Sequence, residues 1–200
     1  DDIIVDGQGH SLNFNLNGSS LVKLPENEQT DLILQNIDIT GTRGYYGGSI
    51  VNQGTIGDIH ANFKNNSSHT AMYGAYGAAI YNHSTGKIGN ISGDFISNNA
   101  FSLFTSGGAI YNSGTIKEIS GNFMYNYAAG GSKGGAIYNT GSIEKITGNF
   151  TQNYITIYNG YSGDKFGGSL YNSGKIGIIS STFDGNYISS EEDSDELKGG

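Results

Sequence analysis

One short pattern is written five times in this chain of 200 residues. Its clearest copy reads GGAIYNSGTIKEISGNFMYN at residues 107–126, and the other copies begin at Gly47, Gly77, Gly134 and Gly167. The aliphatic residue at the fourth position of each copy recurs at intervals of 30, 30, 27 and 33 residues. A period of this size holds one structural unit per copy, so we expect a solenoid in which each repeat contacts only its neighbours.

Each copy divides into short segments with the character of β-strands. In the clearest copy, residues 109–112 are closed by a Ser-Gly turn and followed by residues 115–117. A third segment runs from Ile119 to about Tyr125, where apolar and polar residues alternate. No segment has the apolar spacing of a long helix. We therefore predict an all-β, right-handed parallel β-helix of about six coils, with three short strands per coil.

Four columns of apolar residues occupy equivalent positions in the copies. Successive coils of a β-helix lie about 4.8 Å apart, so the members of a column should lie directly above one another. We predict that the core consists of the columns Ile50, Ile80, Ile110, Ile137 and Leu170; Ile56, Ile88, Ile116, Ile143 and Ile176; Ile59, Ile91, Ile119, Ile146 and Ile179; and Phe63, Phe95, Phe123, Phe150 and Phe183.

Two columns of asparagine accompany the apolar columns. Asparagine tolerates turn conformations, and stacked amides can hydrogen-bond along a ladder. Because an unpaired buried amide costs about 1–3 kcal/mol, we expect both columns to be hydrogen-bonded or exposed and to have a structural role. The columns are Asn52, Asn82, Asn112, Asn139 and Asn172, and Asn66, Asn98, Asn126, Asn153 and Asn186.

The two ends of the chain depart from the repeat. Residues 1–46 alternate like strands without the motif, and we expect them to form an irregular opening coil that caps the β-helix. The five regular repeats occupy residues 47–188. Residues 189–200 are acidic and poor in apolar side chains, which indicates a flexible tail or linker.

Composition excludes several classes of function. The formal net charge is −8 and Arg43 is the only arginine, so the basic stripe that nucleic-acid binding requires is missing. No stretch approaches the roughly 20 apolar residues that span a bilayer. The chain contains no cysteine, and its four histidines share no spacing suited to a metal site. We expect neither a metal nor a cofactor.

Aromatic side chains are the candidate binding residues. A tyrosine follows the repeated aliphatic residue in four copies, so it should point outward where the aliphatic side chain points inward. This stripe either stabilises the sheet by stacking, or offers flat apolar faces with polar tips to a glycan or a protein. Its members are Tyr81, Tyr111, Tyr138 and Tyr171.

A second set of candidates lies between the repeats. Residues 67–76, 99–106, 127–133 and 154–166 vary in length and content, and we predict that they form loops on one edge of the stack. Their aromatic side chains either fold back over the coil or take part in binding, since loops on a rigid scaffold often carry function. The candidates there are Phe101, Phe104, Tyr154, Tyr158 and Tyr161.

A catalytic set is not recognisable. Glycoside hydrolysis needs two carboxylates at a controlled separation. Asp58 and Glu118 share an outer column, but they belong to coils about 10 Å apart. No Ser-His-Asp set can be assembled either, so we predict that the chain is not an enzyme. A polysaccharide-active β-helix enzyme and a purely structural spacer remain alternatives.

The repeated GGAI and FxxN motifs resemble the passenger repeats of chlamydial polymorphic membrane proteins and related autotransporter adhesins. They stand here as residues 107–110 and 123–126 and recur over residues 47–186, with GAAI, GGSI or GGSL in other copies. The resemblance implies a β-helical passenger exported across the outer membrane, displayed or secreted as a virulence factor. Its partner would be a protein or glycan on a host or neighbouring cell.

Two further expectations concern the surroundings of the chain. Following the resemblance, contact with a membrane would occur only through an anchor domain outside this sequence. The open edges of stacked coils also allow self-association along the β-helix.

Overall fold

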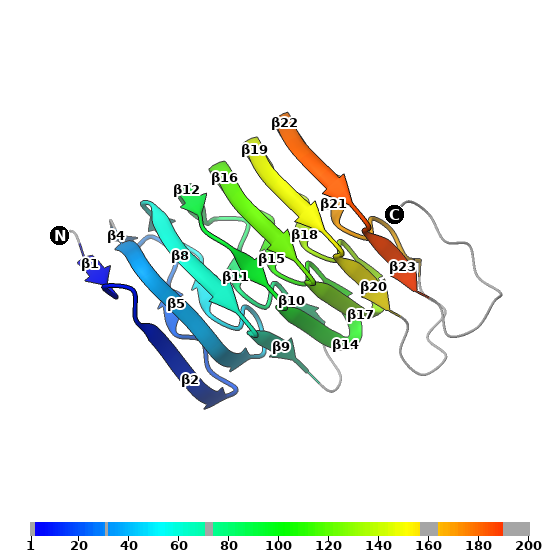
Figure 1. Cartoon of the computed structure of the whole chain (residues 1–200). Helices are drawn as coiled ribbons and strands as arrows, with labels where there is room; N and C mark the ends of the chain where they lie inside the picture. Colours follow the sequence, from blue (N-terminus) through cyan, green and yellow to red (C-terminus); the bar gives the residue numbers. More distant parts are fainter. Residues whose placement is uncertain (1–2, 31, 71–73, 157–163, 190–200) are drawn as a thin grey trace.

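The computed structural model describes residues 3–30, 32–70, 74–156 and 164–189, and all statements below refer to these. In this part the chain forms 23 β-strands and no helix. The strands lie in two sheets of 17 and six strands that run along one axis, with the first strand, β1 (Ile3–Asp6), and the last, β23 (Tyr187–Ser189), at opposite ends (Figure 1). The chain contributes one strand per coil to the smaller sheet, and its six strands there span about five turns of the solenoid. The prediction of an all-β parallel solenoid is confirmed.

The smaller sheet is built from the first strand of each repeat, preceded by one strand of the N-terminal segment. Its strands pair in parallel, with Ile80 opposite Ile110 and Ile110 opposite Ile137, so equivalent residues of the repeats are neighbours. The strands are β3 (Val22–Leu24), β6 (Ile50–Asn52), β11 (Ile80–Asn82), β15 (Ile110–Asn112), β18 (Ile137–Asn139) and β21 (Leu170–Asn172).

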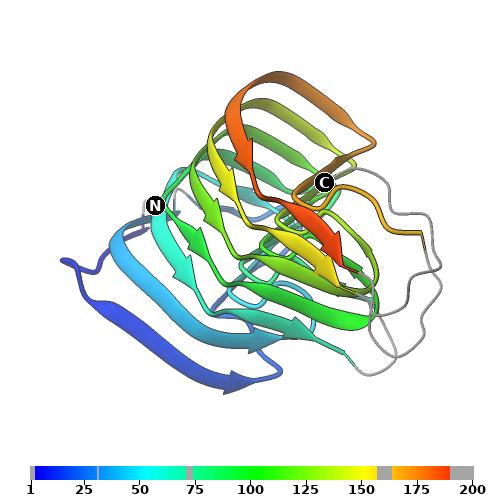
Figure 2. The same ribbon diagram turned by 45° about the vertical axis from the view of Figure 1, so that its right-hand side comes forward.

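The larger sheet carries the other two Ile columns and the Phe column, and then continues around a corner (Figure 2). The strands before the corner are β1 (Ile3–Asp6), β2 (Ser11–Asn17), β4 (Gln29–Thr30), β5 (Leu32–Gly44), β7 (Thr55–Ile56), β8 (Ile59–Lys64), β12 (Lys87–Ser92), β13 (Phe95–Ile96), β16 (Thr115–Met124), β19 (Ser142–Thr151) and β22 (Lys175–Asp184). The strands after the corner are β9 (Ser67–His69), β10 (Ala75–Tyr76), β14 (Asn99–Ser106), β17 (Tyr127–Lys133), β20 (Tyr154–Thr156) and β23 (Tyr187–Ser189).

The strand boundaries within a coil differ from the prediction. The second and third predicted segments of the clearest copy form one strand, β16, which keeps its register with β19 over its whole length. Gly121 adopts a φ of 134° within β16, a conformation that favours glycine, so the strand continues through this point without a break. The described parts of the segments predicted as loops are largely strands, because β9, β14, β17 and β20 pair with one another through the backbone. Backbone pairing tolerates their variable side chains.

The four predicted apolar columns form the core. Their members from the second to the fifth coil of the stack are buried, and the phenylalanine rings stack with centroids 4.6–5.0 Å apart from Phe63 to Phe150. At the C-terminal end, Ile179 and Phe183 are 47% and 48% exposed. Each coil therefore depends on the next one to cover its apolar side chains.

Both asparagine columns are buried hydrogen-bond ladders along most of their length. The amide nitrogen of Asn82 donates to Oδ1 of Asn112 at 2.7 Å, and Asn112 donates in the same way to Asn139. In the second column, Asn98 donates to Oδ1 of Asn126 at 2.9 Å. The expectation that buried amides would be satisfied is confirmed, and their role is structural.

The segment predicted as an opening coil contributes more than one layer to the stack. Strand β5 pairs in parallel with β8 of the first regular repeat, and β1 and β2 pair in turn with β5. The apolar columns continue through it, because Leu34 lies opposite Ile59 and Ile39 lies opposite Phe63.

Candidate binding surfaces

The tyrosine stripe (Tyr81, Tyr111, Tyr138 and Tyr171) lies on the outer side of the six-stranded sheet. Each ring belongs to the middle residue of β11, β15, β18 or β21, between an inward aliphatic residue and an asparagine. Successive ring centroids are 5.1, 5.0 and 5.1 Å apart, and their planes are inclined by 28°, 21° and 11°. All four side chains are half-buried. The stripe is therefore a continuous stacked ladder.

Stacking decides which part of each ring a ligand can reach. Tyr111 and Tyr138 each have a ring neighbour on both faces. Their apolar faces are thus largely covered by the ladder itself, which leaves the ring edges, with the phenol hydroxyls, as the parts of these half-buried rings that a ligand could reach. The sequence did not reveal this, because it shows that rings are adjacent but not how their planes are oriented. The stripe offers a row of hydroxyl groups rather than flat faces.

Further aromatic rings border the stripe. Tyr76, at the end of β10, packs edge-on against Tyr111 at 5.0 Å and stacks on Tyr46 at 5.8 Å. At the other end, the Lys133 ammonium lies 5.3 Å from the ring centroids of both Phe166 and Tyr171. Tyr46 and Lys133 were not among the predicted residues. Lys133 belongs to β17 and Tyr46 lies in an isolated β-bridge with Tyr76, so only the pairing of coils brings them to the stripe.

Burial raises the pKa of three phenols of the stripe. Desolvation raises the pKa of Tyr81, Tyr111 and Tyr138, and neighbouring tyrosines raise it further by charge repulsion. For Tyr111, a hydrogen bond with Thr140 partly offsets this rise in pKa. Near neutral pH the hydroxyls of these three tyrosines can therefore both donate and accept a hydrogen bond.

Three of the five predicted loop candidates, Phe101, Phe104 and Tyr154, lie on the strands after the corner and not on loops. Tyr154 stacks between Tyr127 and Tyr187 at centroid distances of 4.9 and 5.1 Å. Phe101 stacks on His69 at 5.3 Å. Phe104 is 58% exposed on β14, and Tyr158 and Tyr161 lie outside the described residues. The structure therefore places Phe101, Phe104 and Tyr154 on the outside of the larger sheet, away from the tyrosine stripe.

The carboxylates considered for catalysis are bound by neighbouring side chains and backbone. Asp58 accepts hydrogen bonds from the backbone N–H and the amide of Asn90 at 2.8 and 3.0 Å, and Glu118 forms a 2.9 Å ion pair with Lys145. The backbone hydrogen bond from Asn90 holds the pKa of Asp58 below its usual value, against the effect of burial. A general acid for glycoside hydrolysis needs a raised pKa, so Asp58 is unsuited to that role.

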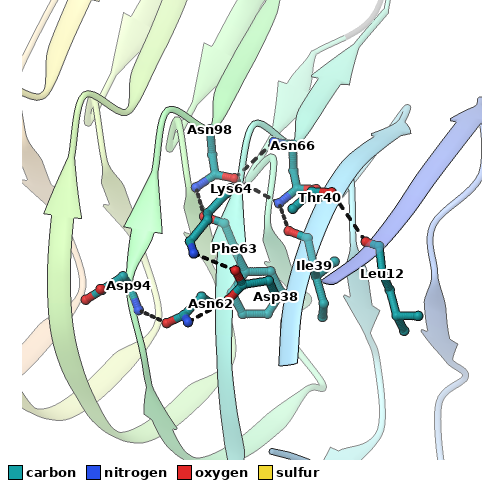
Figure 3. Close-up of polar contacts among 10 residues, drawn as sticks. All are labelled: Leu12, Asp38, Ile39, Thr40, Asn62, Phe63, Lys64, Asn66, Asp94 and Asn98. Atoms are coloured by element: carbon teal, nitrogen blue, oxygen red, sulfur yellow. Dashed lines mark hydrogen bonds and ion pairs between the residues drawn. The ribbon is translucent and has the colours of Figure 1, made fainter. Parts of the chain in front are cut away.

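A polar column on the outer face of the larger sheet was not predicted. Asp38 accepts hydrogen bonds from the Asn62 amide at 2.7 Å and from the Lys64 ammonium at 2.6 Å (Figure 3). Burial would raise the pKa of Asp38, but the bonds from Lys64 and Asn62 lower it on balance. The Asn62 side-chain oxygen accepts from the backbone of Asp94, whose carboxylate accepts from Asn122. These outer polar groups are engaged with one another from coil to coil.

The described residues contain no group of three or more His, Asp or Glu side chains that could hold a metal ion. Nor does this part of the chain contain a helix that could cross a membrane. Comparison of the chain with protein-family models, with curated proteins and with solved structures finds no match.

Proposed function

We propose that the chain is a non-catalytic, extracellular β-helix segment of a bacterial surface or secreted adhesin, of the autotransporter-passenger type. Its partner is a protein or glycan on a host or neighbouring cell. The observation that carries this proposal is the tyrosine stripe, a row of phenol hydroxyls held at regular spacing on a rigid sheet.

The regular spacing supports contact with a repeating or extended partner. The hydroxyls follow the coil spacing, because Tyr81, Tyr111 and Tyr138 are paired residue for residue in parallel strands. Their side chains are already ordered by stacking, so binding costs little additional side-chain entropy. Tyrosine is enriched at binding surfaces for this combination of an ordered apolar ring and a polar tip.

Two features support a non-catalytic role outside the cell. The acidic groups nearest to a catalytic arrangement, Asp58 and Glu118, are already engaged by neighbours in the stack. The Cys-free composition suits any compartment, including the cell exterior.

The proposal is tested by removing the hydroxyls while keeping the rings. The variant Tyr81→Phe/Tyr111→Phe/Tyr138→Phe should retain the stacked ladder and the fold, and should bind cells or glycan arrays at least 10-fold more weakly than the wild type. Tyr125→Phe is the matched control, because Tyr125 is 50% exposed at the corner after β16 and is not part of the stripe.

Three results would contradict the proposal in different ways. Unchanged binding by the triple variant removes the stripe as the contact surface. Absence of binding by the wild type to any glycan or cell favours a structural spacer. Release of reducing ends from a polysaccharide favours an enzyme.

A further inference from the structure

A groove crosses the strands after the corner on the outside of the larger sheet. Its volume is about 360 Å³, and it is lined by Arg43, Ser67, His69, Asn99, Phe101 and Tyr127, among others. These residues come from the end of β5 and from β9, β14 and β17, which pair side by side along the axis (Figure 1). The groove is therefore separate from the tyrosine stripe, which lies on the other sheet.

In the groove, Tyr127 has a ring face that no ring of the described residues covers. Tyr127 stacks on Tyr154 at 4.9 Å with an interplanar angle of 11°, which covers one of its faces. On the opposite side, its strand partner in the column is Asn99, a smaller, non-aromatic residue. The ladder of rings thus begins at Tyr127. Unlike the inner rings of the stripe, Tyr127 can present an apolar face to a ligand.

The groove also holds the only guanidinium group of the chain. Arg43 is exposed and forms no ion pair with any described residue. His69 lies on the neighbouring strand and is stacked on Phe101. None of the lining residues is acidic, although the chain as a whole has a formal net charge of −8. The groove is thus a local site for an anion on an acidic protein.

The order of these groups along the axis sets the size of the ligand. Arg43 pairs with Ser67, Ser67 with Asn99, and Asn99 with Tyr127, which places three strand spacings, about 14 Å, between the first and the last. A ligand that reaches both must be several rings long and must carry its charge toward the N-terminal end of the groove. The Asn99 amide and the Ser67 hydroxyl lie between the two and can hydrogen-bond to its polar groups.

We propose that this groove binds an acidic oligosaccharide through a carboxylate. The planar guanidinium of Arg43 holds the carboxylate by two parallel hydrogen bonds, a geometry that arginine provides and lysine does not. A sugar ring further along the ligand packs on the open face of Tyr127. This inference rests on the proposed function as a contact segment, for which it names a second surface and a class of ligand.

The test uses the whole chain and a defined pair of probes. One is an oligomer of four galacturonic acid units, and the other is the same oligomer with its carboxyl groups reduced to alcohols. Calorimetry should show binding of the acid that weakens with added salt, and at least 10-fold weaker binding of the reduced form. Arg43→Gln should lower the affinity for the acid at least 10-fold, while Lys117→Gln, on an exposed position of β16, should not.

Two variants at Tyr127 separate the role of its face from that of its hydroxyl. Tyr127→Phe should bind the acid as the wild type does, and Tyr127→Leu should bind it several-fold more weakly. The thermal midpoint of each variant checks that the fold is intact. A sulfated neutral oligomer that binds as tightly as the acid would show that the site recognises any anion and would overturn the carboxylate assignment.

The outcomes distinguish this inference from the proposed function. Equal binding of the acidic and the reduced oligomer, or unchanged binding of the acid by Arg43→Gln, overturns the proposal that the groove binds an acidic oligosaccharide. It leaves the proposal of adhesion through the tyrosine stripe intact. Loss of adhesion in the stripe variant with intact acid binding assigns the two surfaces separate ligands and supports both proposals. A chain that binds no saccharide and no cell overturns both.

Discussion

Asn98 donates two hydrogen bonds to a single oxygen of Asn126: its backbone N–H lies 3.0 Å and its amide nitrogen 2.9 Å from Oδ1 of Asn126. The amide of Asn126 in turn donates to Oδ1 of Asn153 at 2.9 Å and to the carbonyl of Phe95 at 2.8 Å. One buried side chain thus connects three successive coils.

The variant Asn126→Ala should be strongly destabilised. It leaves both donors of Asn98, the carbonyl of Phe95 and Oδ1 of Asn153 short of a partner, so we expect a loss of more than about 3 kcal/mol in the free energy of unfolding. Urea unfolding followed by circular dichroism measures it. Asn149→Ala is the control, because Asn149 is exposed on the outer face and should cost less than about 1 kcal/mol. An equal loss in the free energy of unfolding of the two variants would contradict the view that the asparagine ladder stabilises the fold.

The phenylalanine column predicts a gradient of stability along the axis. Phe123 is fully buried between two rings, so Phe123→Ala should cost about 3–5 kcal/mol. Phe183 occupies the same column at the open end, with 48% of its surface exposed. The same change there should cost less than half as much. Chemical unfolding of the two variants side by side provides the comparison, and a similar cost at both sites would argue against the stacked core.

The tyrosine stripe predicts a loss of stability at high pH. Burial raises the pKa of Tyr81, Tyr111 and Tyr138 above the ordinary value of 10.0, so the folded state binds their protons more tightly than the unfolded state does. This contribution is complete below about pH 10 and is lost as the pH rises through the raised pKa values. The urea midpoint should therefore fall above pH 10, and less steeply in the triple Tyr→Phe variant. A parallel decline in both proteins would assign the effect to other groups.

The two ends of the stack predict association between copies. Val5 and Leu12 are 37% and 39% exposed at one end, and they stand in the columns that finish at the exposed Ile179 and Phe183 at the other. An end-to-end contact would continue each column from one chain into the next, and such a head-to-tail contact does not close on itself. We expect sedimentation velocity to show concentration-dependent growth of the wild type.

Blocking one end at a time tests this expectation. Leu12→Lys and Phe183→Lys should each remain monomeric, while an equimolar mixture should form dimers and nothing larger, because each variant retains one intact end. Ser120→Lys, on the side of the stack, is the control and should associate like the wild type. Growth of both blocked variants would show that the ends are not the contact.

Sequence reasoning was most successful where one residue type fills a column. The isoleucine, phenylalanine and asparagine columns could be predicted, because the same side chain recurs at each coil and its environment is made by its own copies. The strands after the corner could not. Residues 99–106 and 127–133 share little sequence, and only backbone hydrogen bonds align them.

The binding surfaces were predicted in part for a related reason. The tyrosine stripe follows from the repeat, but the coverage of its ring faces depends on ring orientation. The groove depends on Arg43, His69 and Tyr127, which come from three different coils and occupy positions that the repeat does not specify. That these different residues line one groove can be recognised only when the register between the coils is known.

The one-directional amide ladder has a consequence for how a molecule of this kind can change in evolution. Asn82 donates to Asn112 in the way that Asn112 donates to Asn139. Each coil therefore offers the following coil the same hydrogen-bonding groups that the preceding coil offers to it. Loss or duplication of one 27-residue unit, such as residues 107–133, would rejoin matching partners. Genetic recombination could therefore shorten or lengthen the solenoid in steps of about 4.8 Å while the contacts between the remaining coils stay the same.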